Sequence, residues 1–285
     1  MLRLHKTKYH KCTIIALTVR LAPTLGLCLT SLAAMLAFCC SLAHEARAQE
    51  LNAKIIGGSF QGATIDSNVA LISTPDYSCS GALVGQRAIL TAAHCIVEGP
   101  TASQFNVYVG RQWYQVQSTW YQSKFNPREA ASQSARYDLG MLILTKPVTA
   151  INPLPILRGR RLKRGAQITI SGYGTNEDSN DPNRSLIDNL KVGMARVMRA
   201  DGRVLLSTSI SNGASTCAGD SGGPASVSYG RSSIALAGIV SAGVNTVSDD
   251  NRCELRGDGS SIYVDLQSPS SKAFLRAFKG LNYVR

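Results

Sequence analysis

The chain has 285 residues, 44% hydrophobic and 17% charged, a balance that excludes a disordered or fibrous protein and suits one globular unit or two small ones. Lys and Arg outnumber Asp and Glu by 30 to 18, so the net charge is +12. Apart from the short cluster Arg158 to Arg164, no Lys/Arg run is interleaved with aromatic residues. We expect that cluster to be a solvated loop between two halves of the protein, and we expect no nucleic-acid partner. A basic surface of this size would attract acidic partners weakly and without specificity.

The first residues follow the order of a secretory signal. A basic stretch ending at Lys11 precedes a nearly uncharged apolar run from Leu21 to Ala43, and Ala46-Arg47-Ala48 offers the small residues that signal peptidase needs. We predict a signal peptide over 1–48 and a protein secreted to the extracellular space or the periplasm. The apolar run approaches bilayer-spanning length, so an uncleaved anchor is the alternative. Once the signal is cleaved, we expect no stable membrane association.

Four of the eight cysteines lie beyond this leader, and in an exported domain four cysteines favour two disulfides. No pair has the Cys-x-x-Cys spacing and only one histidine accompanies them, so we expect no zinc site and no other metal. The four are Cys79, Cys95, Cys217 and Cys253.

Short β-rich runs, separated by Gly, Pro, Asn and Asp, dominate the chain past Gln49. This spacing predicts an all-β sandwich or pair of barrels. The proline-containing stretch Lys146 to Gly165 is the predicted crossing between two halves, because proline cannot donate to a strand ladder. Apolar residues at helical spacing over Ser268 to Gly280 predict a helix docked on the surface. The predicted strands are Gly81 to Leu90, Phe105 to Val109, Trp113 to Trp120, Leu139 to Leu144, Gln167 to Ser171, Leu190 to Val197, Ile234 to Val240 and Ser261 to Val264.

The strongest local signal is the segment from Cys217 to Pro224, which contains Asp-Ser-Gly-Gly-Pro. Such a string arises by chance in a chain of this length on the order of once in ten thousand. Glycines before the acid and after Ser221 allow a tight turn in which the N–H groups of Gly219 and Ser221 point together at a developing oxyanion. The alternative is a glycine-rich turn without chemistry.

A serine hydroxyl is a poor nucleophile unless a neighbouring base takes its proton. His94 is the only histidine beyond the leader, so it is the only candidate for that base. The imidazole needs a third group to hold its tautomer, and Asp138 stands at the entry of an apolar strand, where a buried charge must be paired. An ordinary strand-entry aspartate is the alternative. The α/β-hydrolase arrangement is excluded, because it places histidine after the serine.

From Ile55 to the C-terminus, the chain resembles the trypsin and chymotrypsin family of serine peptidases. The resemblance implies two antiparallel six-stranded β-barrels, over about 55–160 and 161–267, with the active site in the cleft between them and a C-terminal helix over about 268–280. The matching motifs are Ile55-Ile56-Gly57-Gly58, Thr91 to Cys95, Asp138 before its apolar strand, Ser171-Gly172-Tyr173-Gly174, Gly219 to Pro224, and Ser241-Ala242-Gly243.

The resemblance also implies an endopeptidase that works through an acyl-enzyme and is made as a zymogen. It pairs Cys79 with Cys95 and Cys217 with Cys253. Residues 49–54 become a short propeptide that is cut after Lys54. The new amine of Ile55 then pairs with Asp220, the acid before the nucleophile.

The residues that correspond to the substrate pocket are neutral: Ser215, Ser241, Gly243 and Ser261. Ser215 stands where trypsin-like members carry an aspartate for Lys or Arg, so we predict a preference for apolar or small-to-medium side chains. Basic specificity is the alternative, should one of the carboxylates of Asp249, Asp250, Glu254 or Asp258 turn into the pocket.

No cofactor is implied, and polypeptide substrates, protein inhibitors and a monomeric state are expected. Two other functions stay open at this stage. One is a catalytically inactive relative that only binds a partner, and the other is a serine esterase with the same triad.

Overall fold

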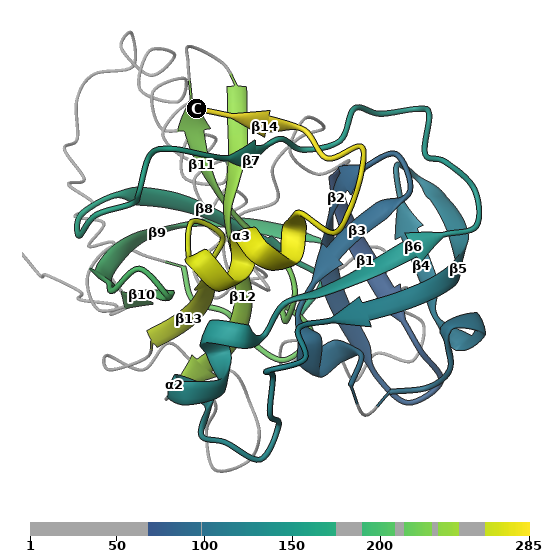
Figure 1. The fold of residues 1–285 in the computed structure, drawn as a ribbon, viewed down its shortest axis with the longest axis horizontal. Helices are drawn as coiled ribbons and strands as arrows, with labels where there is room; N and C mark the ends of the chain where they lie inside the picture. Colours follow the sequence, from purple (N-terminus) through teal and green to yellow (C-terminus); the bar gives the residue numbers. More distant parts are fainter. Residues whose placement is uncertain (1–67, 98, 175–189, 209–213, 230–232, 245–259) are drawn as a thin grey trace, which may run out of the picture. The chain divides into compact units, whose positions relative to one another are not determined.

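Two closed sets of strands make up the structure, a computed structural model that describes residues 68–97, 99–174, 190–208, 214–229, 233–244 and 260–285 (Figure 1). All of these residues belong to one structural unit, Ala53–Arg285. Several predicted features lie outside the described residues: the signal peptide, the propeptide with Lys54 and Ile55, Cys253, and the acids Asp249, Asp250, Glu254 and Asp258.

The first set is an antiparallel barrel of β1 (Val69–Ser73), β2 (Ser78–Gly85), β3 (Ala88–Thr91), β4 (Asn106–Val109), β5 (Gln112–Tyr121) and β6 (Gly140–Leu144). They are joined in the order β1-β2-β3-β6-β5-β4 and close on themselves. The run predicted as one strand from Gly81 to Leu90 is divided between β2 and β3, because Gln86 and Arg87 form the turn between these strands. Closure leaves no free edge that could pair with another chain.

The second set contains β7 (Ile156–Leu157), β8 (Gln167–Gly172), β9 (Lys191–Ala200), β10 (Val204–Thr208), β11 (Pro224–Tyr229), β12 (Ser233–Val244), β13 (Ser260–Asp265) and β14 (Tyr283–Val284). Six of them, β8 to β13, close into a second antiparallel barrel through the pairing of β11 with β12. Strands β7 and β14 extend this sheet in parallel beyond β12. The prediction of two six-stranded barrels is confirmed.

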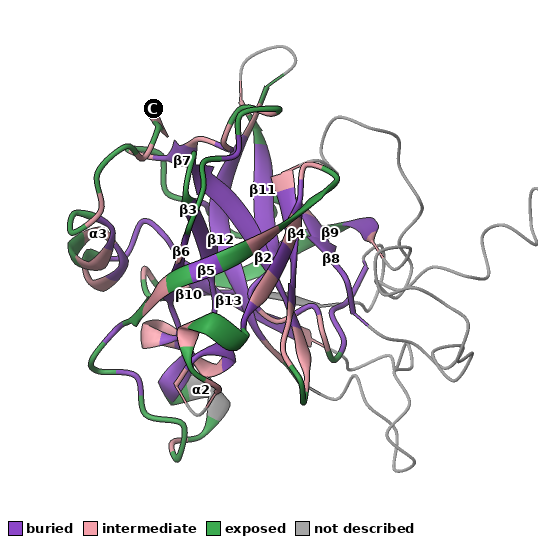
Figure 2. Cartoon of the chain, turned by 90° about the vertical axis from the view of Figure 1, so that its right-hand side faces the viewer, coloured by how far each residue is buried: buried purple, intermediate pink, exposed green. Residues whose placement is uncertain are grey.

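The cores of the two barrels explain why these short strands hold together. Figure 2 shows that the strands are largely buried and that exposed residues gather on loops and on outer faces. One apolar cluster fills the first barrel and continues onto Leu236, Ile239 and Val264 of the second, so the barrels pack against each other. Burial of each such side chain stabilises the fold by about 1.5–3 kcal/mol.

The C-terminal helix α3 (Pro269–Leu275) begins at a good capping sequence. The Ser268 hydroxyl accepts the N–H of Ser271, and Pro269 stands where no N–H is needed. The α-helix ends earlier than the predicted 280, because the following turns use bonds from residue i to i−3 up to Phe278. A second short helix, α2, spans Ala131–Ser134. No helix in the described part of the chain is long and apolar enough to cross a membrane.

Candidate active site

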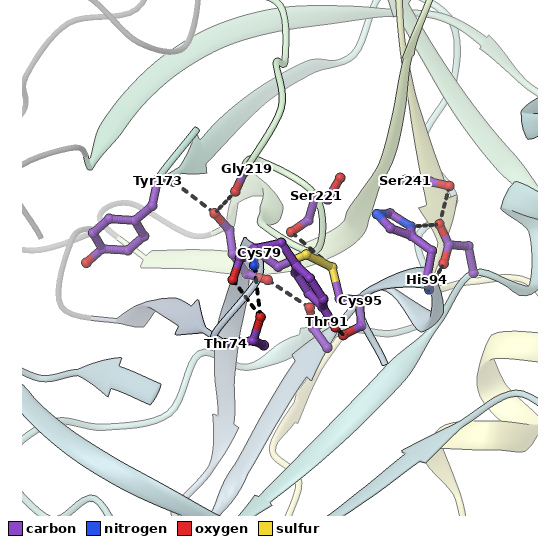
Figure 3. Close-up of a disulfide and its surroundings, with 12 residues drawn as sticks. Thr74, Cys79, Thr91, His94, Cys95, Tyr173, Gly219, Ser221 and Ser241 are labelled. Atoms are coloured by element: carbon purple, nitrogen blue, oxygen red, sulfur yellow. Dashed lines mark hydrogen bonds and ion pairs between the residues drawn. A yellow bond between two sulfur atoms is a disulfide. The ribbon is translucent and has the colours of Figure 1, made fainter. Parts of the chain in front are cut away.

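His94 lies just after β3, in a 3₁₀ turn that spans Ala93–Cys95. The backbone N–H of Ile96 donates to the carbonyl of Ala93 and closes the turn. A disulfide joins Cys95 to Cys79 of β2, which confirms that predicted pair (Figure 3). The imidazole is therefore carried on a short turn that is fastened to the barrel wall at the next residue.

Three hydrogen bonds converge on the carboxylate of Asp138, which is 2% exposed. Its Oδ1 accepts the backbone N–H of His94 at 2.9 Å, and its Oδ2 lies 2.8 Å from His94 Nδ1. The same Oδ2 accepts the hydroxyl of Ser241, a residue of β12 in the second barrel, at 2.6 Å. Since an ionised carboxylate can only accept, the proton in the contact with the ring lies on Nδ1. In the neutral imidazole, Nε2 is then left as the basic nitrogen.

The segment from Cys217 to Pro224 is a tight turn shaped by two glycines. Gly219 and Gly222 have φ values of +88° and +82°, which glycine adopts without Cβ strain. The N–H groups of Asp220 and Gly222 donate to backbone carbonyls. No hydrogen bond within the described part of the chain uses the N–H groups of Gly219 or Ser221. These are the two amides predicted for the oxyanion hole.

Ser80 of β2 ties this turn to the first barrel. Its N–H donates to the carbonyl of Ser221 at 2.7 Å, and its hydroxyl donates to the carbonyl of Gly219 at 2.7 Å. The same hydroxyl accepts the N–H of Tyr173 at 2.8 Å (Figure 3). Ser80 is fully buried, so these bonds take the place of water. Sequence reasoning missed this residue, because a serine next to a strand cysteine gives no sign of a contact with residues so distant in the chain.

Asp220, the residue before Ser221, is completely buried. Its carboxylate accepts the N–H groups of Gly174 at 2.8 Å and Cys217 at 2.9 Å. Burial raises the pKa of Asp220 to about 7, although these two hydrogen bonds lower it. The ion pairs among the described residues do not include this carboxylate. A cation that reached this buried carboxylate would stabilise its anionic form further than the two hydrogen bonds do.

Ser221 lies on the side of the His94 imidazole away from Ser241, as Figure 3 shows. The His94 side chain is 33% exposed, so the ring is accessible from solvent. The hydrogen bonds found among the described residues do not include one between Ser221 Oγ and the ring. Such bonds are often long in enzymes without substrate and tighten when the substrate is bound.

The predicted pocket residues fall into two groups. Ser215 and Ser261 are buried with their hydroxyl oxygens 3.2 Å apart, and Ser261 Oγ also accepts the N–H of Thr216 at 3.1 Å. No hydrogen bond in the described residues joins a carboxylate to this hydroxyl cluster. The other two residues lie on β12. The hydroxyl of Ser241 is bonded to Asp138, and Gly243 is exposed and is paired with Ser261 of β13.

The cysteines of the described residues are all disulfide-bonded. Cys217 is disulfide-bonded, and its predicted partner Cys253 lies outside the described residues. Within the part of the chain that the structure describes, the one cluster of metal-ligand types is Cys79, His94 and Cys95, with ligand atoms within 4.8 Å of one another. Because both sulfurs belong to the disulfide, neither is a thiolate that could bind a metal ion.

Comparison with known proteins agrees with this geometry. The family model described as Trypsin matches residues 55–256. Trypsin delta of Drosophila erecta is 27% identical over 210 residues, which cover 68% of this chain and 80% of the relative. Kallikrein 1-related peptidase b27 of Mus musculus is 30% identical over 183 residues, which cover 55% of this chain and 68% of the relative. The chain therefore belongs to the trypsin family and is a serine-type endopeptidase.

Proposed function

We propose that the protein hydrolyses peptide bonds through a triad of Ser221, His94 and Asp138. The observation that carries this proposal is the contact of 2.8 Å between His94 Nδ1 and the buried Asp138 carboxylate, which leaves Nε2 free to take the Ser221 proton. The Ser221 oxygen attacks the substrate carbonyl, and the protonated imidazole then gives its proton to the leaving amine. Water attacks the resulting acyl-enzyme by the same route and regenerates the serine.

The N–H groups of Gly219 and Ser221 stabilise the negative charge that develops on the substrate's carbonyl oxygen when Ser221 attacks the carbonyl carbon. Two observations support this role: the described structure leaves both amides without an internal acceptor, and Ser80 fixes the carbonyls of the same two residues on the opposite side. Loss of one donor of this kind costs about 10²–10³ in kcat.

The specificity of the enzyme is for apolar or small-to-medium side chains. Neutral hydroxyls at Ser215 and Ser261 satisfy each other, and they offer no charge-assisted bond to Lys or Arg. Polypeptides are the substrates, and protein inhibitors that mimic them are expected partners of a monomeric enzyme. A cleavage profile over a peptide library tests this point, and predominant cleavage after Lys or Arg would reject it.

The enzyme is secreted as an inactive precursor that is cut after Lys54. A new α-amine at Ile55 is cationic at neutral pH, since its pKa is about 8, and it supplies a cationic partner for the buried Asp220 carboxylate, which no ion pair of the described residues includes. The signal-like order of residues 1–48 supports export.

A serine-directed acylating reagent tests the triad. We expect one label per molecule of processed protein and none in Ser221→Ala. Ser103→Ala is a matched control, because Ser103 is an exposed serine of the first barrel and its loss leaves labelling intact. Equal labelling of Ser221→Ala and the control would reject Ser221 as the nucleophile. Turnover of esters without cleavage of peptides would favour the esterase.

A further inference from the structure

The basic loop between β7 and β8 lies beside a second basic segment that is distant in the sequence. The loop is residues 158–165, and the second segment is residues 196–203, from the end of β9 through the hairpin turn to the start of β10. The N–H of Gly165 donates to the carbonyl of Val197 at 2.8 Å, and the N–H of Val197 donates to the carbonyl of Ala166 at 2.9 Å. In Figure 1 the connection from β7 reaches the left end of β8, next to β9.

The side chains continue this contact to the far end of both segments. Arg196 Nη1 lies 3.4 Å from the carbonyl oxygen of Gly165. The guanidinium of Arg161 lies against the turn, where a Cβ added to Gly202 would be 3.1 Å from its Nη1. The loop and the hairpin therefore run side by side and in opposite directions.

Seven exposed cations form what we call the cationic track: Arg160, Arg161, Lys163, Arg164, Arg196, Arg199 and Arg203. Asp201 is the one acid in the two segments, and its ion pair with Arg199 is loose at 3.6 Å. Because a strand rises about 3.3 Å per residue, Arg196 and Arg199 are about 10 Å apart along β9. The track is therefore an elongated surface of excess positive charge rather than a pocket for one small anion.

The composition of the track distinguishes between classes of polyanion. The large exposed aromatic side chains of the described residues, Trp113, Trp120 and Tyr121, lie on β5 of the first barrel. The track itself offers no ring on which a base could stack, and no Asn or Gln that could read a base edge. Its side chains suit a linear chain of sulfate or carboxylate groups, which guanidinium and ammonium groups bind by charge-assisted hydrogen bonds.

We propose that the cationic track is a docking surface for a linear anionic polysaccharide, one that carries sulfate or carboxylate groups. Binding there would hold the peptidase on an anionic matrix through the second barrel. It requires no change in the triad.

Binding of the purified protein to dextran sulfate at about 0.1 M salt tests the proposal. We expect Arg160→Gln/Lys163→Gln/Arg164→Gln to raise the Kd at least about tenfold, since each exposed contact adds to an electrostatic affinity of this kind. Arg196→Gln/Arg199→Gln/Arg203→Gln removes the three cations of the second segment, residues 196–203, and should raise the Kd to a similar extent. The matched control, Arg111→Gln/Arg128→Gln/Lys146→Gln, removes three exposed cations from the first barrel and the connections at its ends. Turnover of a small ester substrate and the thermal midpoint should be unchanged in all three variants.

Two kinds of outcome would overturn the proposal. Absence of wild-type binding would mean that the cationic track is not a docking surface for such a polymer. Equal weakening by the track and control variants would mean that net charge alone attracts polyanions. Tighter binding of duplex DNA or of phosphatidylglycerol vesicles than of dextran sulfate, lost in the same track variants, would assign the surface to a different class of partner.

Discussion

The two barrels hold their shares of the active site by different means. In the first barrel, side chains and a disulfide fix His94, the proposed base: Asp138 is bonded to the ring and the backbone of this residue, and Cys95 is joined to Cys79. In the second barrel, backbone amides fix the turn that carries Ser221, the proposed nucleophile, around one buried carboxylate, that of Asp220. The contacts that hold His94 are present in the described structure, whereas the turn around Ser221 is built on a buried acid whose pKa burial raises to about 7.

Each barrel also forms hydrogen bonds with the part of the site that the other barrel carries. Ser80 of the first barrel holds the turn around Ser221, and Ser241 of the second barrel donates to Asp138. The two halves can therefore be damaged separately, and the resulting losses should differ in kind. Damage to the base should alter only the chemical step, whereas damage around Asp220 should also alter the dependence of folding stability on pH.

The largest expected effect is that of Asp138→Asn. The amide can donate where the carboxylate only accepts, so it holds the imidazole in the wrong tautomer and removes the charge that stabilises the imidazolium. We expect kcat to fall about 10⁴-fold while KM changes little. Steady-state kinetics with a peptide substrate measure both constants, and a loss of less than tenfold would break the assignment of Asp138.

Gly222→Ala should damage the nucleophile turn instead. A side chain at this position would run into the Thr91 hydroxyl and the Ser80 carbonyl, and its φ is +82°. We expect kcat to fall about 10³-fold, because both Ser221 and the oxyanion amides move. Gly165→Ala is the matched control, since Gly165 has a similar φ of +86° but nothing within 4 Å of its Cβ position. It should share the backbone strain and keep full kcat, whereas equal losses would show that strain alone is responsible.

The pH dependence of stability tests the role of Asp220. The pKa of this acid is about 7 in the folded protein and near 3.8 when exposed, so its stabilising contribution is present below about pH 4 and is lost as the pH rises through about 7. Protein that retains residues 49–54 should therefore lose a few kcal/mol of unfolding free energy over that range. Protein that begins at Ile55 should keep this energy up to about pH 8, above which its α-amine loses its proton.

Denaturant unfolding at several pH values measures this difference. Asp220→Asn is the control, because an amide does not titrate and the unprocessed variant should show a flatter profile between pH 4 and 7. Identical profiles for the processed and unprocessed wild-type proteins would contradict a pairing between Ile55 and Asp220.

The smallest expected effect is that of Ser241→Ala, which removes one of three hydrogen bonds to Asp138 and none to the ring. A hydrogen bond to a charged group contributes about 1.5–3 kcal/mol, but the remaining two keep the carboxylate in position. We expect kcat to fall about tenfold with the same pH profile. A loss as large as that of Asp138→Asn would mean that the second barrel positions the base as much as the first does.

The sequence predicted the fold class and the candidate triad because both are encoded locally. A lone histidine, an acid at a strand entry and a glycine-flanked serine each carry their chemistry within a few residues. The contacts of Ser80 and Ser241 are not encoded in this way, since each depends on strands that meet only after both barrels have closed. The contact of the loop 158–165 with residues 196–203 could not be predicted for the same reason, since the two segments are distant in the sequence.

Strand boundaries show the same limit. Five strands of the structure, β1, β7, β10, β11 and β14, are not among the predicted runs. The prediction also merged β2 with β3, because a two-residue turn without glycine or proline gives little signal. The helix was predicted too long because apolar spacing continues through Phe278, while the backbone has already changed to the tighter turn.

The rate at which a serine-directed reagent acylates Ser221 tests the contrast between the two barrels most directly. It should be compared in protein that begins at Gln49 and in protein that begins at Ile55, both at pH 7.5. We predict labelling at least about 10³-fold slower in the longer form, because the oxyanion amides depend on a paired Asp220. Equal rates in the two forms would contradict the account.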